Sequence, residues 1–88
     1  MRTFDFELMS PDNRVALSDV VSVDFATPEG RIQILGGHEA MVAELTRPEI
    51  RVKTASGIWF FVANGAFAHV SGTRTTIVAD GFVRDQKQ

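Results

Sequence analysis

Cysteine is absent from this sequence, so the chain can form no disulfide, no thiolate metal site and no cysteine nucleophile. Long apolar runs are also missing. Nothing approaches the roughly 18 residues of a membrane-spanning helix, so any membrane association must come through a partner. Excess positive charge is missing too, because the formal net charge is -2 and the basic residues are scattered singly. The sequence therefore has no electrostatic footprint for DNA or RNA.

The remaining composition is that of a small soluble domain. Hydrophobic residues make up 44% and charged residues 23%, which excludes a disordered chain. A length of 88 residues predicts one domain, residues 1–88, with a thin core. Asp5 and Glu7 stand where a signal peptide needs an apolar run, which favours a cytoplasmic location.

Short segments of alternating apolar and polar residues, separated by turn residues, run through the chain. This period of two is typical of strands with one solvated face. The expected strands are residues 4–8, 21–25, 32–34, 50–54, 58–62, 67–70 and 75–79. The pattern predicts an all-β fold, a small two-sheet β-sandwich of short, mostly antiparallel strands. Glu39 to Leu45 is the only segment that could form one or two helical turns.

The segment from Ile58 to Val62 is apolar on both faces of the expected strand. If Ile58, Phe60 and Val62 face the interior, alternation places Trp59 and Phe61 on the outer face. Small monomers rarely leave such a pair exposed, so Trp59 and Phe61 are candidate partner-binding residues. The alternative is that the chain itself covers both faces of this sheet.

Side chains for catalysis or metal binding are sparse. His38 and His69 are the only histidines, and neither has the spacing of common zinc motifs. No serine lies in a G-x-S-x-G frame, and no phosphate-binding glycine loop is present. We therefore expect no enzyme activity, no catalytic residue, no metal and no cofactor. Two alternatives stay open: a stand-alone ligand- or protein-binding β-sandwich with Gly36-Gly37-His38 on a pocket rim, and an enzymatic site built from His38, His69 and Asp80.

Four segments resemble the N-terminal half of the epsilon subunits of F-type ATP synthases. TPEGRIQILGGHEAMVAEL, residues 27–45, resembles the family segment that runs from a Glu-Gly pair to a Gly-His pair, and the spacing agrees without a gap. FELMSP (6–11), FFVANG (60–65) and TIVAD (76–80) resemble family segments in the same order. The chain departs from the family at Gly36 and Ala40, where prolines are usual, and at Arg31, which is often acidic or neutral.

The resemblance implies a β-sandwich in the central stalk of a rotary ATP synthase. Such a subunit binds gamma, rests on the membrane ring of c subunits, turns with the rotor and performs no chemistry itself. It would be peripheral, at the cytoplasmic face of the inner membrane. The resemblance also implies that Glu29, Gly30 and Arg31, together with the region of His38, face the polar loops of the ring. It assigns no role to Trp59 and Phe61.

Full-length members of the family continue into a helical hairpin that can restrain ATP hydrolysis. This chain stops at Gln88. If that is its natural end, the resemblance implies a subunit that couples and assembles without inhibition by a hairpin.

Overall fold

A computed structural model describes residues 2–85, and the fold in this range is all-β, as predicted. The strands are β1 (Phe4–Met9), β2 (Arg14–Thr27), β3 (Gly30–Leu35), β4 (Met41–Glu44), β5 (Glu49–Thr54), β6 (Gly57–Asn64), β7 (Phe67–Val70), β8 (Arg74–Val78) and β9 (Gly81–Asp85). No helix in the described part of the chain is long and apolar enough to cross a membrane.

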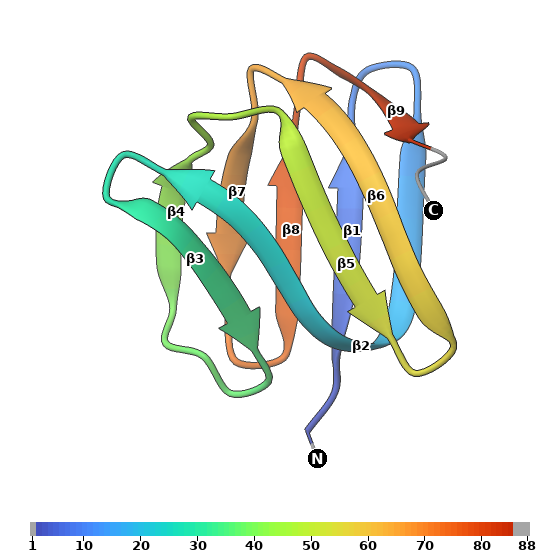
Figure 1. Cartoon of the computed structure of the whole chain (residues 1–88), viewed down its shortest axis with the longest axis vertical. Coiled ribbons are helices and arrows are strands. Elements are labelled where there is room, and N and C mark those ends of the chain that lie inside the picture. Colours follow the sequence, from blue (N-terminus) through green and yellow to red (C-terminus); the bar gives the residue numbers. More distant parts are fainter. Residues whose placement is uncertain (1, 86–88) are drawn as a thin grey trace.

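The strands form two layers that share β2. The hydrogen-bonded order is β4-β7-β8-β1-β2-β5-β6-β9, and β3 pairs with β2 beside this path. In Figure 1 the front layer holds β3, the second half of β2, β5, β6 and β9, while β4, β7, β8, β1 and the first half of β2 lie behind. Among the described strands only β1 and β8 pair in parallel. The predicted two-sheet sandwich of mostly antiparallel strands is confirmed.

Strand β2 passes from one sheet to the other at an irregularity around Asp19. Its first half pairs with β1, and its second half pairs with β3 and β5. The register with β1 shifts between Phe4 and Phe6, and the register with β5 shifts between Val20 and Ser22. Asp19 has a φ of 55°, as expected at a β-bulge that bends a strand. The bulge also breaks the alternation of side chains, which is why the sequence predicted only the second half of β2.

The core lies between the two layers and has an aromatic group at its centre. The ring of Phe61 is 6.2 Å from that of Phe6, 6.1 Å from that of Trp59 and 6.3 Å from that of Phe82, measured between centroids. Other fully buried large side chains come from both layers: Leu8, Val20, Val23, Phe25, Ile34, Ile50, Val52, Val70 and Ile77. Each sheet therefore contributes one apolar face to a single core.

The predicted orientation of β6 is wrong. Phe61 is 1% exposed and Trp59 is half-buried against the core, whereas Ile58 is 42% exposed. The cause is the pairing with β5, in which Ile50 lies opposite Phe61 and Val52 lies opposite Trp59. Residues directly opposite each other share a face, and Ile50 and Val52 are buried. Trp59 and Phe61 therefore do not form an outward-facing pair.

The centre of the segment that could have been helical, Glu39 to Leu45, is a strand. Residues Met41–Glu44 form β4, which pairs with Phe67–Val70 of β7. A helix of one or two turns is unstable alone, whereas β7 supplies backbone partners along the whole segment. The chain end at Gln88, on which the expectation about the hairpin depends, lies outside the described residues.

Candidate partner-binding surfaces

The turn between β2 and β3, together with the first two residues of β3, presents Glu29, Gly30 and Arg31, which are all exposed. The hydroxyl of Thr27 organises this turn, because its Oγ1 accepts a hydrogen bond from the amide of Glu29 at 3.2 Å and donates one to the carbonyl of Gly30 at 3.0 Å. Gly30 has a φ of 119°, and a Cβ there would meet no atom within 4 Å. Glycine is therefore needed for its backbone angle and not for space.

The loop between β3 and β4 carries His38 and is tied to its surroundings by the backbone. The amide of Gly37 donates to the carbonyl of Gly72 at 3.0 Å, and His38 Nδ1 lies 2.9 Å from the carbonyl oxygen of the next residue. A Cβ on Gly36 would lie only 2.6 Å from the Cβ of Arg2. The close passage of Arg2 explains why a larger residue is not found at position 36.

The structure separates these two segments, which the resemblance had assigned to one contact. The Glu29–Arg31 turn and the His38 loop lie at opposite ends of β3, as Figure 1 shows. A strand of six residues spans about 20 Å. The two segments therefore cannot belong to one compact patch.

The residues of the enzymatic alternative do not converge either. The loop of His38 lies near the start of β8, because it contacts Gly72 in the β7–β8 turn. Asp80 lies just beyond the other end of β8. His69 lies opposite Thr76, between these two ends. Within residues 2–85, no group of three His, Cys, Asp or Glu side chains is arranged to hold a metal ion.

A surface that the sequence analysis missed lies on the outer side of β4, β7 and β8. Val42, Phe67 and Val78 are 68%, 55% and 51% exposed. Phe67 lies directly opposite Val78 in the β7–β8 pair, and Val42 is its diagonal neighbour on β4. We call these three residues the Phe67 face. It could have been found from residues 67–70, where alternation places Phe67 on the same face as the polar His69 and buries Ala68 and Val70.

The acids of β1, on the β8 side of the Phe67 face, are paired within the chain. Glu7, on β1, is 8% exposed although it points outward, because Arg14 and Arg74 cover it. Arg74 Nη1 lies 3.4 Å from Glu7 Oε1, and its Nη2 lies 3.9 Å from Asp5 Oδ2. The charges of β1 are thus satisfied within the chain, whereas the apolar side chains of the Phe67 face are left without cover.

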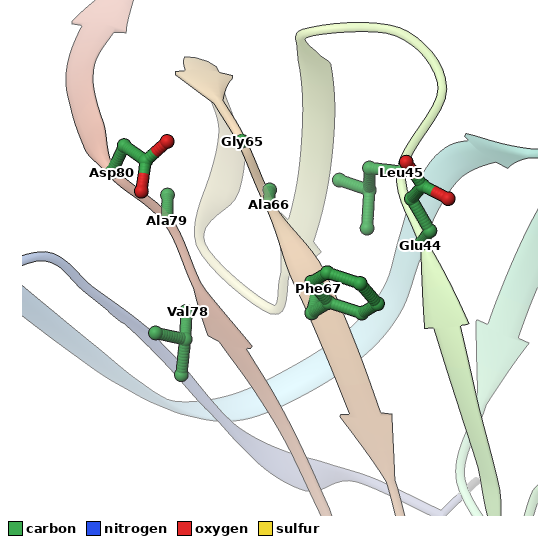
Figure 2. A pocket seen from close by; sticks show the side chains of 8 residues that line it. All are labelled: Glu44, Leu45, Gly65, Ala66, Phe67, Val78, Ala79 and Asp80. Atoms are coloured by element: carbon green, nitrogen blue, oxygen red, sulfur yellow. The ribbon is translucent and has the colours of Figure 1, made fainter.

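A hollow of about 460 Å³ opens where the Phe67 face meets the end of the sheet (Figure 2). Backbone bonds fix its walls: Leu45 donates to the carbonyl of Ala66 at 2.9 Å, and Asp80 donates to that of Asn64 at 2.8 Å. Gly65 has a φ of 61°, and a Cβ there would overlap Oδ2 of Asp80. The Asn64-Gly65 and Ala79-Asp80 segments, far apart in sequence, therefore meet at this hollow.

Comparison with known proteins gives the chain a family context. Residues 3–85 match the family described as "ATP synthase, Delta/Epsilon chain, beta-sandwich domain". The sodium-ion-specific ATP synthase epsilon chain of Propionigenium modestum is 34% identical over 80 residues, which are 91% of this chain and 58% of that protein. The ATP synthase epsilon chain of a Bradyrhizobium species is 38% identical over 81 residues, 91% of this chain and 59% of that protein.

The fold has a counterpart among solved structures. A chain in the mitochondrial ATP synthase of Euglena gracilis, solved as an assembly of OSCP, F1 and c-ring, superposes with a TM-score of 0.83 and 26% identity. The match covers 93% of this chain and 53% of that one. The present chain thus corresponds to a little over half the length of these similar proteins.

Proposed function

Because the chain belongs to the β-sandwich family of ATP synthase delta and epsilon chains, we propose that it is a non-catalytic subunit of the central stalk of a rotary F-type ATP synthase. In this role it links gamma to the membrane ring of c subunits and turns with them. It contributes coupling and assembly, while ATP is made and hydrolysed on other subunits. The match over residues 3–85, which includes every strand, supports this proposal over a stand-alone ligand-binding module.

The Phe67 face is the proposed docking surface for gamma. Val42, Phe67 and Val78 are neighbours on one face of the sheet, and each is more than half exposed. Removing apolar surface from water contributes about 25 cal/mol per Å², so covering three such side chains stabilises a complex substantially. This surface replaces the Trp59–Phe61 pair as the candidate for the gamma contact, because Phe61 has almost no exposed area.

The proposed contact with the c ring is the turn of Glu29, Gly30 and Arg31. Its side chains are exposed at one tip of the sandwich, where they can meet the polar loops of a ring without disturbing the core. His38 belongs to the opposite end of β3 and is left for a different neighbour along the stalk. Through this contact the subunit is peripheral to the membrane, at its cytoplasmic face.

Two valines of similar exposure test the gamma contact. Val78→Asp places a charge in the Phe67 face, whereas Val83→Asp places the same charge on β9, in the other sheet, at a residue that is 64% exposed. Binding to purified gamma is measured by surface plasmon resonance or by pull-down. We expect Val78→Asp to weaken binding by at least about tenfold, since the apolar contact is lost and a charge is buried.

We expect Val83→Asp to bind gamma within about twofold of the unchanged chain. Circular dichroism of both variants checks that the fold is retained. If both variants lose affinity for gamma equally, the Phe67 face is not the gamma contact. Failure of the unchanged chain to bind gamma, alone or with the c ring, would reject the proposed function.

A further inference from the structure

We propose that the hollow between Glu44 and Asp80 receives a basic side chain, arginine in particular, from the partner that covers the Phe67 face. The identity of that partner as gamma rests on the proposed function. The chemistry of the hollow rests on the geometry of this chain alone.

The hollow has an apolar floor with an acid on each side. Phe67 and Ala66 of the β7 region lie between Glu44, at the end of β4, and Asp80, just after β8, as Figure 2 shows. β4 and β8 are the two neighbours of β7, and Asp80 lies two residues past Val78, which is level with Glu44, so the acids stand about 12 Å apart at the backbone. A long cationic side chain fits this arrangement, because its stem can lie on the apolar floor while its charge reaches an acid.

Both carboxylates are available for such a partner. Glu44 and Asp80 are exposed, and neither forms an ion pair within residues 2–85. Glu7, on the same sheet, differs from both because it forms ion pairs with Arg14 and Arg74. The charge at the hollow is therefore left for a cation from outside the described part of the chain.

The position of Asp80 is set before any partner arrives. Its amide donates to the carbonyl of Asn64 at 2.8 Å, and its carboxylate occupies the space that a side chain on residue 65 would need. The backbone of Glu44 is fixed by the next residue, because the amide of Leu45 donates a hydrogen bond to the carbonyl of Ala66. Because the backbone on both sides is fixed, the conformational freedom lost when a cation binds is confined to side chains.

Arginine suits the hollow better than lysine. A planar guanidinium can stack on the exposed ring of Phe67 and donate two parallel hydrogen bonds to one carboxylate, whereas an ammonium offers a point charge. A contact between a guanidinium and an aromatic ring also occurs within the chain, where the guanidinium carbon of Arg84 lies 4.0 Å from the centroid of the Trp59 ring.

The first test measures binding to gamma as a function of salt. The double variant Glu44→Gln with Asp80→Asn keeps the shape of the hollow and removes its charge. We expect its affinity to fall on the order of tenfold at low salt, and its dependence on salt to flatten, since an exposed pair contributes modestly and is screened. The matched control, Asp12→Asn with Glu49→Gln, neutralises two exposed acids outside the hollow and is expected to bind within about twofold.

The second test uses acetyl-arginine amide as a probe and does not depend on gamma. In a nuclear magnetic resonance titration, we expect millimolar arginine amide to shift the backbone signals of Phe67 and Asp80. The corresponding citrulline amide, a neutral analogue of the same shape, should shift them far less. The double variant should show no difference between the two probes.

The outcomes separate the two proposals. If the unchanged chain binds gamma and the double variant binds equally well, the inference is overturned while the proposed function stands. If gamma does not bind at all, the proposed function fails and the arginine titration decides the inference. Equal shifts from arginine and citrulline amides would reject a cation site. Sedimentation that shows a dimer of this chain, lost in the double variant, would replace gamma with a second copy and overturn the assignment of the partner.

Discussion

Replacing Phe61 by alanine tests the orientation of β6, on which the choice of docking surface depends. The side chain is 1% exposed and contacts three aromatic rings. Truncating a buried phenylalanine removes its transfer free energy and leaves a cavity, which together lower the free energy of unfolding by about 3–5 kcal/mol. Domains of this size have about 4–13 kcal/mol in total, so the variant should lose a quarter or more of its stability.

Phe60→Ala is the matched control, because Phe60 is the next residue on β6 and points to the opposite face. It is half-buried, and its truncation should lower the free energy of unfolding by about 1 kcal/mol. Phe61→Leu should lower the free energy of unfolding by about 1–1.5 kcal/mol. This variant can still be compared with Phe60→Ala if Phe61→Ala does not fold.

Urea unfolding at 25 °C, followed by far-ultraviolet circular dichroism, measures all three variants. Fluorescence of Trp59 is a poor readout here, because its ring packs on Phe61 with centroids 6.1 Å apart. The reasoning is refuted if Phe60→Ala lowers the free energy of unfolding as much as Phe61→Ala. That result would mean that Trp59 and Phe61 lie on the outer face, where they would again be candidate partner-binding residues.

Two further stability predictions use the same assay. Gly65→Ala should lower the free energy of unfolding by about 1–3 kcal/mol, because of its positive φ and the nearby carboxylate of Asp80; a loss below about 0.5 kcal/mol would contradict this. Replacing Arg14 and Arg74 together by methionine should lower it by about 1–3 kcal/mol, more than the two single losses added, because Glu7 is left unpaired. Strict additivity in this double-mutant cycle would show that the two arginines do not share Glu7.

Most of the strands could be predicted from sequence, because one face of each sheet is buried and the other is solvated. The direction of Trp59 could also have been predicted. Ala55 and Ser56 are the only residues between β5 and β6, so the register that sets Val52 opposite Trp59 follows from the short loop. The alternation of Ile50 and Val52 with charged residues then fixes the face of both strands. The predicted direction of Trp59 was wrong because it rested on the pattern of β6 alone and not on the pairing of β6 with β5.

The candidate site was less predictable, for physical reasons. The turn of Glu29 to Arg31 is local, so its residues alone reveal it. The hollow joins Glu44, Phe67 and Asp80, which belong to three segments, and only the pairing of β4, β7 and β8 brings them together. The reason for Gly36 was equally out of reach, because Arg2 comes close to it only in the folded chain.

The parallel pairing of β1 with β8 has a consequence for synthesis of the protein. β1 leaves the ribosome early and can form a hairpin with β2, but Phe6 pairs on its other side with Thr75, near the end of the chain. At about 5–20 residues per second, that partner emerges several seconds later. During this interval the nascent chain carries an open strand edge beside unburied apolar side chains, the kind of edge that recruits other chains. A translation arrest before β8 would therefore yield an aggregation-prone fragment, although all of the front sheet except β9 is already complete.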